Sequence, residues 1–294
     1  MIELNADADE ETLADAVVGV EVIVNCAQTA SPGHRLRYQT KPPHVLRRLV
    51  DAATRAQVRR IVHVSTADVY GPNHSVRITN KSAVKPVHAY ERLKLFEEEW
   101  LLDSAGDIEV VIVRPARMFG DGEDWLTPRL LKAAVHGRVR LPGGGRASQT
   151  FVAAADVGRA CLAASDRGRP GHRYLVGGFD SSWREFLISA ARAAGFVAEV
   201  GSIPYDLAYL QALGAETLTP EGAAVWPGIY AVDVLGKPHF CDDSFSRREL
   251  TWSPSVGSFE QEMPVMAQWL MRIPEVAAAL AAPPPAPVTS PPGR

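Results

Sequence analysis

The chain has 294 residues, of which 46% are hydrophobic and 22% are charged, and its formal net charge is -3 at pH 7. This length suffices for one large core or for a main domain with a smaller one attached, as in an ordinary globular protein. Basic residues are not concentrated in any segment, and no run of about 18 apolar residues occurs, so we expect neither nucleic-acid binding nor membrane insertion.

The three cysteines, Cys26, Cys161 and Cys241, are far apart in the sequence. Zinc sites and disulfide frameworks need paired spacings that these residues lack. Met1 is followed by acidic residues rather than by a basic and then apolar leader. The sequence therefore predicts no metal site and a location in the reducing cytoplasm.

Strand and helix patterns alternate through the first part of the chain. Nearly continuous β-branched runs, typical of parallel strands covered on both faces, occupy residues 20–26, 59–65 and 108–113. Helical patterns lie between them, at residues 42–57 and 87–106. This alternation predicts an α/β fold, a Rossmann-like parallel sheet with helices on both faces.

The two ends of the chain have their own patterns. Residues 2–7 resemble another strand, and residues 9–17 resemble the helix that follows it. After about residue 120 the pattern is less regular, with glycine loops at 142–146 and 176–180 and a helical stretch at 182–195.

The sequence thus predicts three regions. Residues 1–120 form an α/β domain, and residues 121–281 form mainly a smaller lobe with elements that return to the sheet. Residues 282–294 are rich in proline and poor in large apolar side chains, which predicts a disordered tail.

Tyr90 and Lys94 are four residues apart in the helical pattern at 87–106 and therefore share one helix face. A free phenol has a pKa near 10, and a fixed positive charge beside it favours the phenolate. We therefore expect Lys94 to lower the pKa of Tyr90 and make it an acid/base. The hydroxyl of Thr66, or less favourably that of Ser65, could donate to the same substrate oxygen.

A Tyr and a Lys at this spacing form a weak motif by themselves, but their context is specific. Six blocks in order match an extended short-chain dehydrogenase/reductase: "GVEVIVNCAQTA", "VRRIVHVSTADVYG", "YERLK", "VRPARMFGDGED", "FVAAADVGRACLAAS" and "RRELTWSP". The chain resembles the NAD(P)-dependent epimerase/dehydratase family over roughly residues 2 to 270. The resemblance implies an enzyme that uses NAD or NADP. It also implies that residues 1–120 are a partial dinucleotide-binding Rossmann domain and that residues 121–281 are mainly a substrate-binding lobe.

The resemblance also implies roles for individual residues. Thr66, Tyr90 and Lys94 would be the catalytic set, and Lys94 would also contact the nicotinamide ribose. The remaining residues implied to contact the cofactor are Asp7 near the adenine, Cys26, Ala27, Gln28 and Ser65 along the dinucleotide, and Pro115 and Ala116 beside the nicotinamide.

The family's glycine-rich phosphate loop is not recognisable in this sequence, because Gly19 is the only glycine among the first 30 residues. We expect the sheet to lack the strands that flank this loop and dinucleotide binding to be weakened, to millimolar affinity or below detection. A late start or truncated gene, a partner that completes the fold, and a chain that no longer depends on dinucleotide are the open explanations.

Other departures concern the substrate. Family dehydratases carry Asp-Glu where this chain has Ala67-Asp68, so sugar dehydration is disfavoured. Nucleotide-sugar epimerases usually carry an Arg that holds a phosphate where Gln149 stands. The stretch "FDSSWREFL" resembles the 3β-hydroxysteroid dehydrogenase branch. Arg117 and Gln149 are the candidate substrate contacts, although Arg117 could instead form a salt bridge.

These observations predict an NAD(P)-dependent oxidoreductase or epimerase that acts on a secondary alcohol or ketone of a small molecule. The alternatives are a cofactor-poor binding or scaffold subunit and a cofactor-independent enzyme that reuses the pocket. A homodimer is an open alternative for its assembly, and the sequence does not distinguish NAD from NADP.

Overall fold

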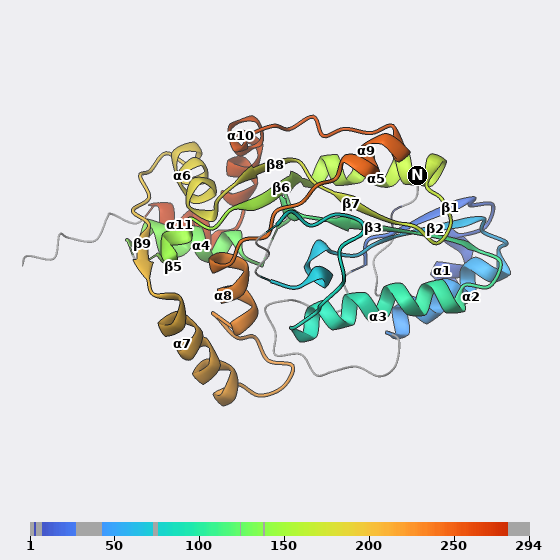
Figure 1. Cartoon of the computed structure of the whole chain (residues 1–294), viewed down its shortest axis with the longest axis horizontal. Helices are drawn as coiled ribbons and strands as arrows, with labels where there is room; N and C mark the ends of the chain where they lie inside the picture. Colours follow the sequence, from blue (N-terminus) through green and yellow to red (C-terminus); the bar gives the residue numbers. More distant parts are fainter. Residues whose placement is uncertain are drawn as a thin grey trace, which may run out of the picture.

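The structure is a computed structural model that describes residue 3 and residues 8–27, 43–72, 76–123, 125–137 and 139–281. Its main sheet has the strand order β1-β2-β3-β7, and all of these neighbours are parallel. The strands are β1 (Val22–Asn25), β2 (Arg60–Val64), β3 (Glu109–Pro115) and β7 (Arg173–Val176). Their carboxyl ends therefore lie along one edge of the sheet (Figure 1).

Helices cover both faces of this sheet (Figure 1). One face carries α1 (Glu10–Ala16), α2 (His44–Arg55) and α3 (Ala89–Ser104), and the other carries α5 (Ala154–Arg167) and α9 (Ser244–Leu250). The prediction of a Rossmann-like α/β fold is confirmed.

The central strands are apolar on both sides because each face packs against helices. Ile61 of β2 and Ile112 of β3 belong to the core beneath α1 and α2. Their neighbours in sequence, Val62 and Val113, belong to the core beneath α5. Successive side chains of a strand point to opposite faces, so two cores are built from one continuous apolar run.

Strand β1 departs from the expectation of strands covered on both faces. Within the described ranges it pairs only with β2, and Val24 is 37% exposed. Its last residue, Asn25, is buried. The sequence pattern shows that β1 is a strand, but not how completely its neighbours cover it.

Residues after 116 build a second, smaller set of layers. A three-stranded sheet has the order β4-β6-β8, and a two-stranded sheet pairs β5 with β9. The strands are β4 (Arg117–Phe119), β5 (Arg140–Pro142), β6 (Gln149–Ala153), β8 (Phe179–Ser181) and β9 (Gly201–Ile203). The helices are α4 (Thr127–Val135), α6 (Trp183–Ala193), α7 (Tyr205–Leu218), α8 (Ile229–Gly236), α10 (Phe259–Leu270) and α11 (Pro274–Ala281).

The core of this second part is rich in phenylalanine, whereas the cores of the main sheet are mainly aliphatic. The rings of Phe119 and Phe259 meet edge to face with centroids 5.2 Å apart. Phe151 and Phe186 stack at 6.2 Å. Such ring pairs contribute about 0.5–1.5 kcal/mol each beyond the area they bury. Phe119 of β4 and Phe151 of β6 belong to this core, which therefore holds both strands in place.

The expected elements correspond to those observed, with three qualifications. The glycine run near 142–146 forms a 3₁₀ turn, η2 (Gly143–Gly145), in which each glycine has positive φ. The strand expected at 2–7 and the tail at 282–294 lie outside the described residues. β7 and α5 do return to the main sheet, and the division near residue 120 remains our proposal.

Candidate active site

The first part of the site is the turn that follows β2. Thr66 is the N-cap of a 3₁₀ helix, η1 (Ala67–Tyr70), and its hydroxyl oxygen accepts from the backbone amide of Asp68 at 3.2 Å. This acceptor role leaves the hydroxyl proton of Thr66 free to donate. Because β2 ends at the carboxyl edge of the sheet, Thr66 lies where ligands of open α/β sheets bind.

The second part is the start of α3, which packs against η1. Glu91 closes a capping box, in which its carboxylate accepts from the amides of Val87 and His88 at 2.6 and 3.0 Å. This cap fixes the first turn of α3, which carries Tyr90. Lys94 follows one turn later and is buried.

The electrostatics around Tyr90 differ from the expectation. Burial, followed by the negative charges of Asp68 and Glu97, raises the pKa of Tyr90 above that of a free phenol, and Arg117 opposes them. The expected pKa of Tyr90 was lower than that of a free phenol, but the net shift is upward, and burial is its largest cause. The Lys94 ammonium donates to Glu97 Oε2 at 2.8 Å, so its charge is matched by that carboxylate.

Glu97 belongs to a buried set that we call the Lys94 cluster: Lys94, Glu97, His63 and Asn25. His63 Nε2 lies 3.6 Å from Glu97 Oε2, which is longer than an ordinary hydrogen bond. Burial opposes ionisation of Glu97, but the contacts with His63 and Lys94 lower its pKa to about 2. Glu97 is therefore a carboxylate at neutral pH.

The hydrogen bonds of Asn25 define the tautomer of His63. Asn25 Oδ1 accepts from the amide of Ala27 at 3.1 Å, so the Asn25 amide nitrogen faces His63 Nδ1 at 3.0 Å. Nδ1 must then accept, which leaves the proton on Nε2, the atom nearest Glu97. Burial, and then the Lys94 charge, lowers the pKa of His63, so the ring is neutral.

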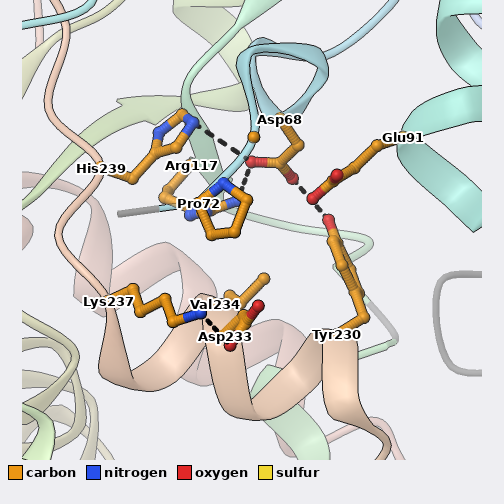
Figure 2. A pocket seen from close by; sticks show the side chains of 10 residues that line it. Asp68, Pro72, Glu91, Arg117, Tyr230, Asp233, Val234, Lys237 and His239 are labelled. Atoms are coloured by element: carbon orange, nitrogen blue, oxygen red, sulfur yellow. Dashed lines mark hydrogen bonds and ion pairs between the residues drawn. The ribbon is translucent and has the colours of Figure 1, made fainter. Parts of the chain in front are cut away.

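A second set of charges surrounds Asp68 of η1, and we call it the Asp68 cluster: Asp68, Arg117, Gln149, Tyr230 and His239. The Asp68 carboxylate accepts from Arg117 and from the Tyr230 hydroxyl, and His239 Nε2 lies 3.6 Å from it. Although burial would raise it, Arg117 and His239 hold the pKa of Asp68 below its usual value. Figure 2 shows Asp68 between these partners.

Asp68, Arg117 and His239 line one side of a small hollow, and Tyr230, Asp233 and Val234 of α8 line the other side (Figure 2). On α8, Asp233 accepts from His88 Nε2 at 2.9 Å and pairs with Lys237 Nζ at 3.1 Å. Both cations that line the hollow, Arg117 and Lys237, are therefore paired with carboxylates. The hollow offers hydrogen-bonding groups without an excess of positive charge.

Tyr230 connects this hollow with the expected catalytic residues. Its ring contacts that of Tyr90, with centroids 5.5 Å apart, and stacks on Trp125 at 5.4 Å. Glu91 reaches the hollow from α3, and burial is the largest influence that raises its pKa to about 7. The site thus joins aromatic rings with a carboxyl group that titrates near neutrality.

Two expected contacts are made to the protein itself in this structure. The Ser65 hydroxyl donates to buried Glu98. Gln149 is fully buried, donates to the carbonyl of Val234 at 3.1 Å and accepts from Arg117 Nε at 3.0 Å. Gln149 thereby orients Arg117, and the expected roles of Ser65 at the cofactor and of Gln149 at the substrate remain predictions.

For Arg117, the observed arrangement is the salt-bridge alternative, although the residue also lines the hollow. Cys26 and Ala27 follow β1, and Pro115 and Ala116 lie at the end of β3, so these residues share one sheet edge with Thr66. Asp7 and Gln28 lie outside the described residues. Roles in catalysis or cofactor binding remain predictions for all of them.

The sheet edge fits the nicotinamide half of a dinucleotide. The buried Lys94 ammonium has three N–H donors, one of which is given to Glu97. Its charge reaches Cys26, where it opposes the effect of burial, which raises the pKa of that thiol. Thr66 adds a hydroxyl from the neighbouring strand. A group with ribose and amide oxygens could use these donors.

Sequence reasoning missed most of the hollow. Tyr230, Asp233, Lys237 and His239 come from a segment that carried no recognised motif. One signal was available, since Asp233 and Lys237 are four apart, the spacing of an ion pair on one helix face. The approach of this face to α3 could not be read from that spacing.

The fold is Rossmann-like, and proteins of this class bind their ligands at the carboxyl edge of the parallel sheet. The sequence matches the NAD dependent epimerase/dehydratase family over residues 3–177. The chain belongs to this family, whose members depend on NAD, and it is an enzyme of that kind.

Relatives within the family differ in activity. The chain is 29% identical over 257 residues to 4-hydroxy-2-methyl-3-oxo-4-farnesyl-3,4-dihydroquinoline-1-oxide ketoreductase of Stigmatella aurantiaca, covering 84% of this chain and 76% of that protein. It is 33% identical over 180 residues to sterol demethylase protein B of Methylococcus capsulatus, covering 58% of this chain and 54% of that protein. The chain thus spans about half the length of the second relative.

Solved structures confirm the fold. The UDP-glucuronic acid 4-epimerase of Bacillus cereus, in complex with UDP-glucuronic acid and NAD, matches with a TM-score of 0.66 at 20% identity, covering 90% of this chain and 80% of that chain. The dTDP-glucose 4,6-dehydratase DesIV of Streptomyces venezuelae, a double mutant with NAD bound, matches with a TM-score of 0.66 at 22% identity, covering 92% and 79%.

Proposed function

We propose that the protein interconverts a secondary alcohol and the corresponding ketone of a small molecule. Tyr90 would transfer the proton, Lys94 would support its charge, and Thr66 would donate to the substrate oxygen. The observation that carries the proposal is that the turn after β2 packs against the first turns of α3, which places all three residues at the carboxyl edge of the sheet.

The dinucleotide, when bound, supplies or accepts the hydride. Lys94, Cys26, Ala27, Pro115 and Ala116 would hold its nicotinamide half. Thr66 can donate because its hydroxyl accepts from the Asp68 amide and keeps its own proton. The phenol of Tyr90 is protonated at neutral pH, as its raised pKa requires, and is ready to give a proton to a ketone oxygen.

The charges of the hollow support a neutral substrate. Arg117 and Lys237 are paired with Asp68 and Asp233, so a diphosphate would meet no free cation from these two residues. Tyr230 and Trp125 add aromatic surface. The relative named as a ketoreductase of a farnesyl-bearing compound supports a ketone carried on an apolar molecule. We therefore place apolar ketones and alcohols before sugar nucleotides.

The test is to incubate the protein with a panel of secondary alcohols and NAD or NADP. Reduction of the nicotinamide is measured by its absorbance. Tyr90→Phe should lower kcat/KM by about 10²–10⁴, the usual contribution of a general acid/base. Tyr209→Phe on α7 makes the same chemical change outside the lining of the hollow, so it should retain the parent rate. Equal turnover by Tyr90→Phe and the parent would show that Tyr90 is not the acid/base.

A second candidate is a cofactor-poor binding subunit. One observation favours it: the Lys94 ammonium is already matched by Glu97 inside the protein. Calorimetry with NAD and NADP separates the candidates, since a micromolar dissociation constant contradicts a cofactor-poor subunit.

The reducing cytoplasm and a homodimer remain predictions. Cys26, Cys161 and Cys241 are all free thiols. Among helices in the described ranges, none is long and apolar enough to span a membrane.

A further inference from the structure

The feature that the proposed mechanism does not use is the carboxylate of Glu97. Tyr90, Lys94 and Glu97 are at positions i, i+4 and i+7 of α3, which places them in one stripe along the helix. Lys94 is in the middle of this stripe, with a carboxylate on one side and the phenol on the other. Glu97 pairs with the Lys94 ammonium, and its negative charge also acts on Tyr90.

Burial makes this pairing strong. Lys94 is 5% exposed and Glu97 is 1% exposed, so water screens their interaction little. Lys94 Nζ and Glu97 Oε2 are 2.8 Å apart, the length of a charge-assisted hydrogen bond. A carboxylate so close to the ammonium cancels much of the field that Lys94 would otherwise exert on Tyr90.

The position of Glu97 is also supported from the sheet. His63 of β2 is 1% exposed, and its Nε2, which carries the proton, has no hydrogen-bond partner among the described residues. The nearest carboxylate oxygen of Glu97 is 3.6 Å away. If Glu97 moved away, the buried N–H of His63 would lose its nearest carboxylate oxygen, which costs free energy. His63 therefore helps to hold Glu97 in place.

We propose that Glu97 is a positioning residue for Lys94, and that its negative charge, acting on the phenol and on the neighbouring Lys94 ammonium, sets the pH range in which Tyr90 works. The inference rests on the proposed function of Tyr90 and Lys94. Replacing the carboxylate with a neutral group removes its own repulsion of the phenolate and leaves the Lys94 ammonium without its paired carboxylate. The phenolate then forms at lower pH.

Other charged groups around the stripe are unchanged by this substitution. Lys94 also lies near Cys26, which follows β1. The charges of Asp68 on η1 and Arg117 on β4 also act on Tyr90, and these two residues are paired with each other. On α8, Tyr230 contacts the Tyr90 ring. Glu97 is thus the carboxylate of the described residues that pairs directly with Lys94.

The test uses the full chain with ¹³C at the Cζ of tyrosine, because this NMR signal reports ionisation without substrate or cofactor. The Tyr90 resonance is assigned by its loss in Tyr90→Phe. In Glu97→Gln we expect Tyr90 to ionise about one to two pH units below the parent, within the range where circular dichroism remains native. The pH limb of alcohol oxidation should shift by the same amount.

Three variants complete the design. Glu97→Asp keeps the charge and should follow the parent curve. Glu99→Gln makes the same chemical change at an exposed position of α3 and should also follow the parent. Glu97→Met matches the volume without polar atoms, should shift like Glu97→Gln, and replaces it if that variant does not fold.

The two levels of the hypothesis fail separately. Unchanged Tyr90 ionisation in a folded neutral variant at position 97 overturns the role of Glu97. An equal shift in Glu99→Gln also overturns it, because the effect would then come from net charge alone. Full activity of Tyr90→Phe instead overturns the proposed function, whatever the NMR titration shows.

Discussion

The Lys94 cluster and the Asp68 cluster both bury charges beside Tyr90, but they are assembled differently. The Lys94 cluster combines one helix, α3, with the neighbouring strands β1 and β2. The Asp68 cluster joins η1 to β4, β6 and α8, and Tyr230 is 162 residues from Asp68 along the chain. We infer that the first cluster adjusts ionisation, whereas the second ties the lobe to the sheet.

The largest effect on stability should come from breaking the ion pair between Arg117 and Asp68. Arg117→Met leaves Asp68 buried without its main cation, and removing one partner of a buried pair costs about 3–5 kcal/mol. Urea denaturation measures the free energy of unfolding. Arg59→Met is the matched control, because Arg59 is 47% exposed and a surface pair contributes at most about 1 kcal/mol.

A double variant sharpens this result. Asp68→Asn combined with Arg117→Met removes both charges, so no buried ion remains unmatched. We expect it to be more stable than Arg117→Met alone, although it carries one more substitution. Additive losses from the two substitutions would show that the ion pair does not act as a unit.

Glu91 should make stability fall as pH rises. Its pKa is raised from 4.5 to about 7, chiefly by burial, so the folded state binds more protons than the unfolded state between these values. The free energy of unfolding should therefore decline across this window by on the order of 3 kcal/mol. Glu91→Gln should remove the decline. A decline that persists in this variant would show that another group causes it.

Glu97 should show the opposite pH dependence on the same helix. Its pKa is lowered from 4.5 to about 2, so the stability it contributes is complete above pH 4.5 and is lost as pH falls towards 2. The loss should again be on the order of 3 kcal/mol. Acid denaturation of Glu97→Gln should lack this contribution, whereas Glu99→Gln, changed at an exposed position, should retain it.

The smallest effect on stability should come from Asn25, an uncharged member of the Lys94 cluster. Asn25→Ala removes the hydrogen bonds to His63 Nδ1 and to the Ala27 amide. Loss of neutral bonds at a buried site should cost about 1–2 kcal/mol. Thermal unfolding at neutral pH measures this cost. A loss as large as that of Arg117→Met would contradict the distinction between the two clusters.

The sequence by itself determined the fold class and the order of elements. Ile61, Val62, Ile112 and Val113 belong to apolar runs whose character on both faces is typical of parallel strands. The four-residue spacing of Tyr90 and Lys94 determined that they share a helix face. Thr66 could be placed at a strand end because hydroxyl residues follow a β-branched run. These inferences depend on local backbone periodicity, which the chain order contains.

Only the tertiary structure decided how these groups act on one another. The sequence predicted a lowered pKa for Tyr90, but burial and then the charges of Asp68 and Glu97 raise it. Gln149 is held by Arg117 and by backbone carbonyls, contacts that its position in the sequence does not reveal. Tyr230 reaches Asp68 because α8 packs near α3. Electrostatic interactions depend on distance and solvent exposure, and neither can be read from spacing along the chain when the partners lie on different elements.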